Sequence, residues 1–160
     1  MPRVYLETSF VSACVSNRTD AASIYRREAS RDWWQAQGPR HELFVSLAVL
    51  AELSAPAYPM SREALDWVMN IPSLEIDEEV RGFAEILVRE RVMPSPVAGD
   101  AIHVAVACVH DLDYLLSWNV RHLANPNKLT HLRTICVRVG YLPPRILTPD
   151  LLWEDPDELS

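Results

Sequence analysis

The sequence lacks the short motifs that identify several common classes of enzyme. No Asp-x-Asp pair follows a strand-like segment and no glycine-rich phosphate loop is present, which argues against phosphatases and kinases. A Gly-x-Ser-x-Gly segment is also missing, so a hydrolase with a catalytic triad is poorly supported. Candidate chemistry must therefore come from residues that lie far apart in the chain.

Cysteine is scarce as well. The 160 residues include three cysteines, which are scattered and form no Cys-x-x-Cys pair. An odd, scattered set argues against a disulfide framework or a zinc site and favours a reducing compartment, here the cytoplasm. Because all three have apolar neighbours, we expect Cys14, Cys108 and Cys136 to be small core residues.

Long apolar runs are absent too. The longest stretches, such as residues 44–53, are too short or too interrupted to cross a bilayer, and no basic leader precedes an apolar segment at the start. We therefore expect no membrane association and no export. The composition, 49% hydrophobic and 23% charged, is typical of a globular protein of one domain. We assign that domain to residues 1–150 and an acidic, partly ordered tail to residues 151–160.

The net charge of −7 argues, on average, against a nucleic-acid partner. However, residues 114–149 contain no Asp or Glu. The basic residues of that span are Arg121, Lys128, Arg133, Arg138 and Arg145. Since exposed charges act over about 8–10 Å at physiological salt, such a region can attract phosphate on an acidic protein. A solvated face that merely lacks acids explains the same pattern equally well.

Short apolar strands alternate with helices along the chain. Strands are expected at residues 4–6, 42–46, 73–76, 114–117 and 145–147. Helices are expected at residues 10–15, 20–37, 47–54, 62–69, 78–92 and 101–109, with a helical turn at 120–124, a break at Asn125-Pro126 and an element of open type at 128–139. This alternation predicts a three-layer α/β/α sandwich around a mainly parallel sheet. Ligands of such sheets lie beyond the carboxyl ends of the strands.

Three acidic residues lie where apolar residues would be expected. Glu7 closes the first strand, Glu52 lies in an otherwise apolar helix, and Asp100 opens the helix that follows Gly99. Each has an ordinary explanation, as a turn residue, an exposed glutamate or a helix cap. Together, however, carboxylates from distant segments are what a hard cation such as Mg²⁺ or Mn²⁺ requires.

Four segments, in order, resemble the motifs of the PIN domain family, the nuclease fold of VapC-type toxins. Residues 4–11 are similar to its opening strand and helix, residues 46–53 and 99–107 to its second and third acidic motifs, and residues 113–123 to its fourth. The resemblance covers roughly residues 3–148, most of the chain. Two positions depart from the family pattern: the first acid is Glu7 rather than Asp, and the fourth is Asn119, which offers a carbonyl oxygen but no charge.

The resemblance implies a ribonuclease that hydrolyses RNA phosphodiester bonds with Mg²⁺ or Mn²⁺. By analogy Glu7, Glu52 and Asp100 hold the metal, and Asn119 completes the catalytic set. Three firm carboxylates favour one tightly held metal, with a second depending on substrate phosphate.

The surroundings of these residues are assigned in the same way. The resemblance implies that Ser9 and Ser117 hydrogen-bond carboxylates or phosphate, and that Arg121 and His122 contact RNA. Trp118 either stacks on a base or covers the core. We expect His103 to pack in the core with a hydrogen bond to the backbone.

The resemblance also implies partners and a biological role. VapC-type proteins are toxins of type II toxin–antitoxin pairs, commonly dimerise, and pair with a small antitoxin whose C-terminal segment covers the acidic site. We expect such a segment to approach Arg121 or Arg133. One alternative is a catalytically weak or inactive PIN-fold module that binds RNA or protein, in which Asn119 in place of the fourth acid would reflect the lost activity. The other alternative is a different phosphoryl-transfer reaction.

Overall fold

The structure is a computed structural model that describes residues 1–154, and it confirms the predicted α/β class. Five strands form one sheet in the order β3-β2-β1-β4-β5, and every pairing is parallel. The strands are β1 (Arg3–Leu6), β2 (Glu42–Ser46), β3 (Ser73–Leu74), β4 (Tyr114–Leu116) and β5 (Arg145–Leu147). From β1 the chain adds β2 and then β3 toward one edge of the sheet, and β4 and then β5 toward the other edge. The strand order therefore reverses between β1 and β4, which makes their carboxyl ends the expected place for a ligand.

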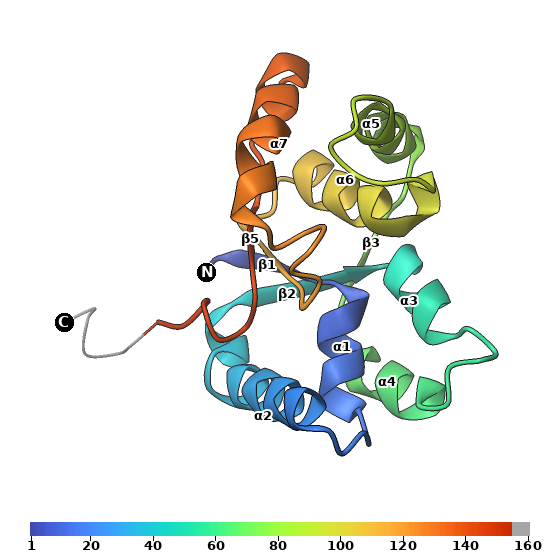
Figure 1. Cartoon of the computed structure of the whole chain (residues 1–160), viewed down its shortest axis with the longest axis vertical. Coiled ribbons are helices and arrows are strands. Elements are labelled where there is room, and N and C mark those ends of the chain that lie inside the picture. Colours follow the sequence, from blue (N-terminus) through green and yellow to red (C-terminus); the bar gives the residue numbers. More distant parts are fainter. Residues whose placement is uncertain (155–160) are drawn as a thin grey trace.

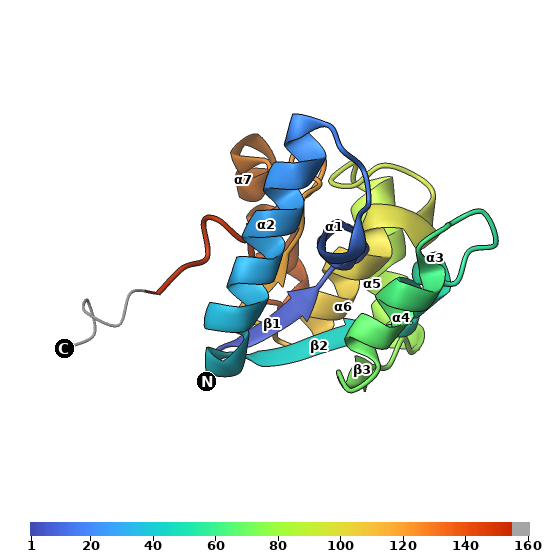
Figure 2. The same cartoon turned by 90° about the horizontal axis from the view of Figure 1, so that it is seen from below.

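Helices cover both faces of the sheet, as the three-layer prediction requires (Figure 1). On one face lie α1 (Thr8–Val15), α2 (Ala21–Ala36) and α4 (Ser61–Val68), which Figure 2 shows from their own side. On the other face lie α5 (Glu78–Arg89), α6 (Ile102–Val109) and α7 (Pro126–Val139). Three further elements are the 3-10 turn η1 (Gly38–Arg40), α3 (Leu47–Leu53) after β2, and the π-helical turn η2 (Val97–Ala101) before α6.

Side-chain caps explain where most helices begin. Asp20 caps α2 as predicted, with its carboxylate accepting from Ser23 N at 3.1 Å. By contrast, α4 begins at Ser61 itself, one residue before the expected start, and has no side-chain cap. The predicted break at Asn125-Pro126 is confirmed: the turn at 120–124 ends before the extended Asn125, which caps α7 by accepting from Asn127 N at 3.0 Å. Pro126 then occupies the first turn, where the missing N–H costs nothing.

The core is built around the two central strands. Val4, Tyr5 and Leu6 of β1 are fully buried, as are Leu115 and Leu116 of β4. Burying a large apolar side chain contributes about 1.5–3 kcal/mol, so these strands fix the centre of the molecule. None of the helices within residues 1–154 has both the length and the apolar character needed to cross a membrane.

Two further features bear on the sequence assignments. The three cysteines are buried and free, and the sulfur atoms of Cys108 and Cys136 lie 3.7 Å apart. Residues 151–154, assigned from sequence to the tail, contact α2: Trp33 Nε1 donates to the Leu152 carbonyl at 2.7 Å, and Gln37 Nε2 to that of Glu154 at 3.0 Å. The rest of the predicted acidic tail, 155–160, lies outside the described residues.

Candidate functional site

Polar side chains converge beyond the carboxyl ends of β1, β2 and β4. Glu7 follows β1 directly, and Ser117 and Asn119 follow β4. Glu52 lies on α3, which begins where β2 ends, and Asp100 lies in η2. The parallel sheet therefore brings together segments that are more than 100 residues apart in the chain, between the first and the fourth motif.

Glu7 is buried and has one tightly held oxygen. Its side chain is 5% exposed and caps α1, where Oε2 accepts from Ser9 N at 3.0 Å. The same oxygen also accepts from the hydroxyls of Ser9 and Ser117, the latter at 2.9 Å. The two serines in turn contact each other at 3.2 Å. Because three donors hold Oε2, the direction of the carboxylate is fixed and Oε1 faces away from these bonds.

Asp100 does not form the helix cap that was the ordinary explanation of its place in the sequence. It lies inside η2, where Gly99 has non-helical torsion angles, and no side-chain cap precedes α6. Instead, Asp100 Oδ1 accepts from Asn119 Nδ2 at 3.1 Å. The helical chain already continues from η2 into α6, so no free N–H is left at this point for a cap.

Asn119 forms hydrogen bonds through its backbone N–H and through both ends of its side-chain amide. Its backbone N–H donates to Ser117 Oγ at 2.9 Å, and its Oδ1 accepts from His122 N at 3.2 Å. The amide oxygen that the sequence offered to a cation is therefore already hydrogen-bonded. Its amide nitrogen holds Asp100, so Asn119 links the ends of β4 and η2.

His103 is buried as predicted, but the predicted hydrogen bond to the backbone is wrong. Its Nε2 contacts Glu52 Oε1, and its Nδ1 lies 2.6 Å from the hydroxyl of Tyr5. That hydroxyl also contacts Ser46 Oγ at 2.8 Å. With a neutral imidazole, Ser46 donates to Tyr5, Tyr5 to His103, and His103 to Glu52. Asp100 and His103 are three residues apart at the start of α6, a spacing that puts both on one helix face.

The carboxylates contribute to raised pKa values of two buried side chains beside them, His103 and Tyr5. Burial alone would lower the pKa of His103, but the hydrogen bond to Glu52 and the charges of Glu7, Glu52 and Asp100 outweigh it and raise that pKa. Burial raises the pKa of Tyr5 well above its ordinary value, the bond to Ser46 opposes this, and the charges of Glu7 and Glu52 add to it. The charges of these carboxylates make the potential at the site negative, which attracts cations.

The donor set fits a hard divalent cation. Two ligands bound to one ion at about 2.0–2.6 Å lie no more than about 5 Å apart. Within residues 1–154, ligand atoms of Glu7, Glu52 and His103 all lie within 4.8 Å of one another. Asp100 is not in this group and is held beside it by Asn119. Since His103 Nε2 already contacts Glu52, oxygen atoms are the available ligands: Glu7 Oε1 and Glu52 Oε2, and outside the group Asp100 Oδ2, accept no hydrogen bond from the described residues.

A cavity of about 530 Å³ opens beside the acids. Ser9 and Asn119 line it on the side of the acids, and Arg18 and Arg26 add positive charge. Trp118 also lines it, but the ring is 8% exposed, its Nε1 donates to Ser30 Oγ at 2.8 Å, and the Arg26 guanidinium lies 5.6 Å above it. Of its two predicted roles, the packing role is the one that these contacts support.

Sequence reasoning missed several of these residues. Tyr5 and Ser46 looked like ordinary strand residues, and only the parallel pairing of β1 with β2 brings their hydroxyls together. Arg18 and Arg26 lie outside residues 114–149, the basic span found in the sequence. Arg121 is exposed and its side chain has no hydrogen bond among the described residues, whereas His122 is half-buried and bound through its backbone to Asn119.

Comparisons with known proteins match only at the level of structure. No family model and no curated protein sequence matches the chain. The VapBC-1 structure from nontypeable Haemophilus influenzae matches with a TM-score of 0.57 at 15% identity, over 92% of this chain and 98% of that one. FitAcB from Neisseria gonorrhoeae matches with a TM-score of 0.54 at 13% identity, over 93% and 99%. VapBC2 from Rickettsia felis, bound to a DNA fragment from its promoter, gives 0.55 at 12%, over 74% and 89%. The chain has the fold of the VapC-like PIN domains.

Proposed function

We propose that this chain is a metal-dependent endoribonuclease, the toxin of a type II toxin–antitoxin pair. The observation that carries the proposal is the arrangement of three carboxylates at the switch point of the sheet. Each uses one oxygen in a hydrogen bond that fixes its direction and keeps the other free. A structural cap or an exposed acid needs no such arrangement, whereas a metal site does.

Glu7, Glu52 and Asp100 would hold Mg²⁺ or Mn²⁺. Such an ion lowers the pKa of a bound water and neutralises charge on a phosphate. The remaining residues keep the carboxylates in place: Ser117 holds Glu7, and His103 holds Glu52. Asn119 does the same for Asp100. Because the side chains are held before the ion arrives, little conformational entropy is lost on binding.

The cavity beside the acids gives the substrate a place to bind. Its volume of about 530 Å³ falls in the range of ligand pockets, about 300–1,000 Å³. Arg18 and Arg26 can contact phosphate oxygens at the far side from the carboxylates. A negatively charged strand can therefore approach the acidic site along positively charged walls, although the protein as a whole is acidic.

The partners follow from the structural matches. All three are named as complexes of the VapBC or FitAB type, which supports a small antitoxin as the partner of this chain. We propose that the antitoxin covers the same acidic site, that the free protein is a homodimer, and that it acts on RNA in the cytoplasm. Light scattering of the purified chain tests the dimer, and co-purification with the product of an adjacent small reading frame tests the antitoxin.

Cleavage of a panel of RNAs with Mn²⁺, Mg²⁺ or EDTA tests the activity. We expect products with Mn²⁺ or Mg²⁺ and none with EDTA. Asp100→Asn keeps the shape of the side chain but removes its charge, and should lose cleavage by at least two orders of magnitude, on the order of the effect of removing one catalytic electrostatic group. Equal cleavage by both proteins would mean that the activity comes from a contaminant. RNA binding without cleavage would favour the alternative, a binding module that has lost turnover.

A further inference from the structure

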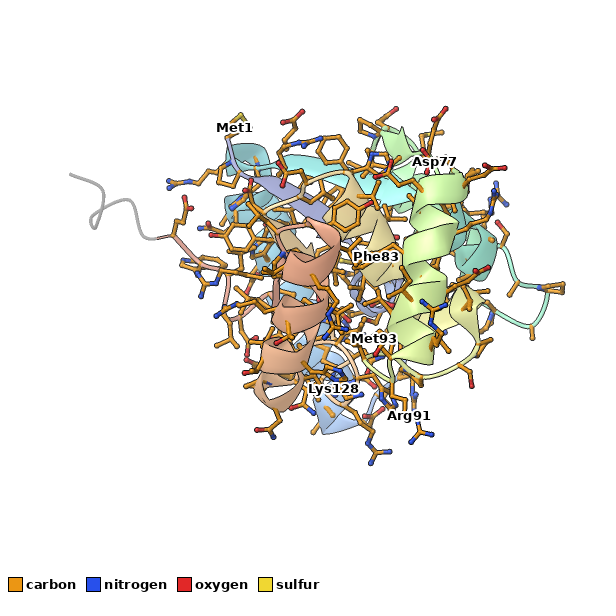
Figure 3. All side chains as sticks on the ribbon, turned by 90° about the horizontal axis from the view of Figure 1, so that it is seen from above. Met1, Asp77, Phe83, Arg91, Met93 and Lys128 are labelled. Atoms are coloured by element: carbon orange, nitrogen blue, oxygen red, sulfur yellow. The ribbon has the colours of Figure 1, made fainter. Side chains whose placement is uncertain are left out.

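A second cavity, of about 300 Å³, lies between the end of α5 and the start of α7. Its lining is contributed by these two helices, by the loop after α5 and by the turn after Asn119, and consists of Val88, Arg91, Met93, Pro94, Ser95, His122 and Lys128. Figure 3 looks at the molecule from this side and shows Arg91, Met93 and Lys128 at the neighbouring ends of the two helices. The cavity is separate from the one lined by Arg18 and Arg26.

The charged side chains that line this cavity are all basic. Arg91, Lys128 and His122 line it, and no acidic residue does. None of the ion pairs formed among residues 1–154 involves Arg91 or Lys128, and neither side chain has a hydrogen bond there. The Nδ1 of His122 is buried and has no hydrogen-bond partner in the same part of the chain. Because, among the described residues, Arg91 and Lys128 are unpaired and no acid lines the cavity, its potential favours an anion.

The backbone at Arg91 supports a role for its side chain. Arg91 follows the last turn of α5 with a φ of 58°, in the left-handed region, and its N–H donates to the Val88 carbonyl at 3.0 Å. Glycine is the usual residue at this position after a helix, because it adopts such angles without steric cost. Arginine therefore places a guanidinium here in spite of an unfavourable backbone conformation.

The cavity adjoins the acidic site through two short connections. His122, which lines it, donates its backbone N–H to Asn119 Oδ1 at 3.2 Å, and Asn119 holds Asp100. The loop that carries Ser95 continues directly into η2, which carries Asp100. Three residues of chain span at most about 11 Å, so His122 lies within the reach of a neighbouring nucleotide.

We propose that Arg91, His122 and Lys128 form a phosphate subsite that binds the RNA backbone next to the phosphodiester bond that is cleaved. The proposal rests on the proposed ribonuclease function. It adds a path for the RNA, which would run through the first cavity, across the three acids and into the second cavity. Phosphate contacts of this kind position the strand and read no bases, so the subsite contributes affinity rather than sequence preference.

The test is the binding of a fluorescent single-stranded RNA in EDTA, where no metal-dependent cleavage takes place. Each lost phosphate contact reduces the dependence of log K on log salt by about 0.7, which corresponds to a loss of about fourfold in affinity at 0.15 M salt. We expect this for Lys128→Gln and for Arg91→Gly, and roughly 15-fold for the double variant. Arg138→Gln is the matched control, because Arg138 is an exposed residue of the same helix, about 15 Å from Lys128 along its axis.

The Arg91→Gly variant separates binding from folding. Glycine suits the left-handed backbone, so its melting temperature should not fall although its affinity does. Affinity and salt dependence equal to wild type in the double variant overturn the subsite, as does a wild-type protein that binds no RNA. A wild-type protein that binds RNA through these residues and cleaves none with any metal leaves the subsite in place and refutes the ribonuclease function instead.

Discussion

Ser117 donates a 2.9 Å hydrogen bond to Glu7, from a position 110 residues further along the chain. The bond joins the ends of β1 and β4, the two strands between which the sheet order reverses. Ser117 also accepts from the backbone N–H of Asn119, which in turn holds Asp100. The Ser117 hydroxyl therefore links Glu7, through Asn119, to Asp100.

Ser117→Ala should weaken the binding of Mn²⁺ by about 10- to 100-fold, as is typical for groups that orient metal ligands. The variant loses the hydrogen bonds of the Ser117 hydroxyl with Glu7, Ser9 and Asn119, so its stability should fall as well, by about 1–3 kcal/mol for each partner left buried and unpaired. Isothermal titration with Mn²⁺ measures the affinity. Ser12→Ala is the control, since Ser12 lines the first cavity but has no hydrogen bond to an acid within residues 1–154. A similar loss in both variants would contradict the role of Ser117.

Tyr5→Phe removes one hydroxyl from the buried chain that runs from Ser46 to Glu52. His103 Nδ1 and Ser46 Oγ then each lose a partner, so we expect the free energy of unfolding to fall by about 1–3 kcal/mol. Urea denaturation measures the change. Tyr25→Phe is the control, because Tyr25 is exposed and, within residues 1–154, its hydroxyl forms a hydrogen bond with Asp150 alone. Equal stabilities of the two variants would show that the buried chain of hydroxyls adds nothing to the fold.

The first cavity should act on substrate binding rather than on the chemical step. Arg26→Gln removes a positive charge from its wall, and we expect KM for RNA to rise about fourfold at 0.15 M salt with kcat unchanged. Steady-state cleavage of a labelled RNA gives both constants. Arg81→Gln, an exposed position on α5, is the control for loss of charge alone. A fall in kcat with constant KM would place Arg26 at the reacting phosphate instead.

Stability at alkaline pH should depend on Cys14. Burial raises the pKa of its thiol to about 12, so the thiol stays protonated in the folded state while it ionises in the unfolded chain. A raised folded pKa gives stability that is complete below the unfolded pKa and is lost as pH rises above it. The stability advantage of wild type over Cys14→Ala should therefore shrink by roughly 2 kcal/mol between pH 8 and pH 10.5. An advantage that stays constant over this range would contradict the raised pKa.

Local patterns in the sequence predicted the sheet well. The bounds of β2 and β5 are those expected, because turn residues and charged residues flank short apolar runs there. The order of the acids along the chain also indicated a site at the strand ends. Glu52 could be recognised as unusual from the sequence alone, since it is the one charged residue of an otherwise apolar helix.

Contacts between distant residues could not be predicted. The hydrogen bond of His103 with Tyr5 spans 98 residues, and its contact with Glu52 spans 51. A histidine in an apolar helix is usually satisfied by the backbone, and only the pairing of the strands reveals another partner. The hydrogen bond that Asn119 Oδ1 accepts from His122 N could not be predicted for the same reason.

We propose that Glu7, Glu52 and Asp100 together hold one divalent cation, and titration of the RNA-free protein with Mn²⁺ measures this binding. We expect wild type to bind one ion, and Glu7→Gln, Glu52→Gln and Asp100→Asn each to lose at least about tenfold in affinity. Glu85→Gln, an exposed position on α5, should bind as wild type does. Equal Mn²⁺ affinity in wild type and in all three site variants, or no binding by wild type, would contradict the account.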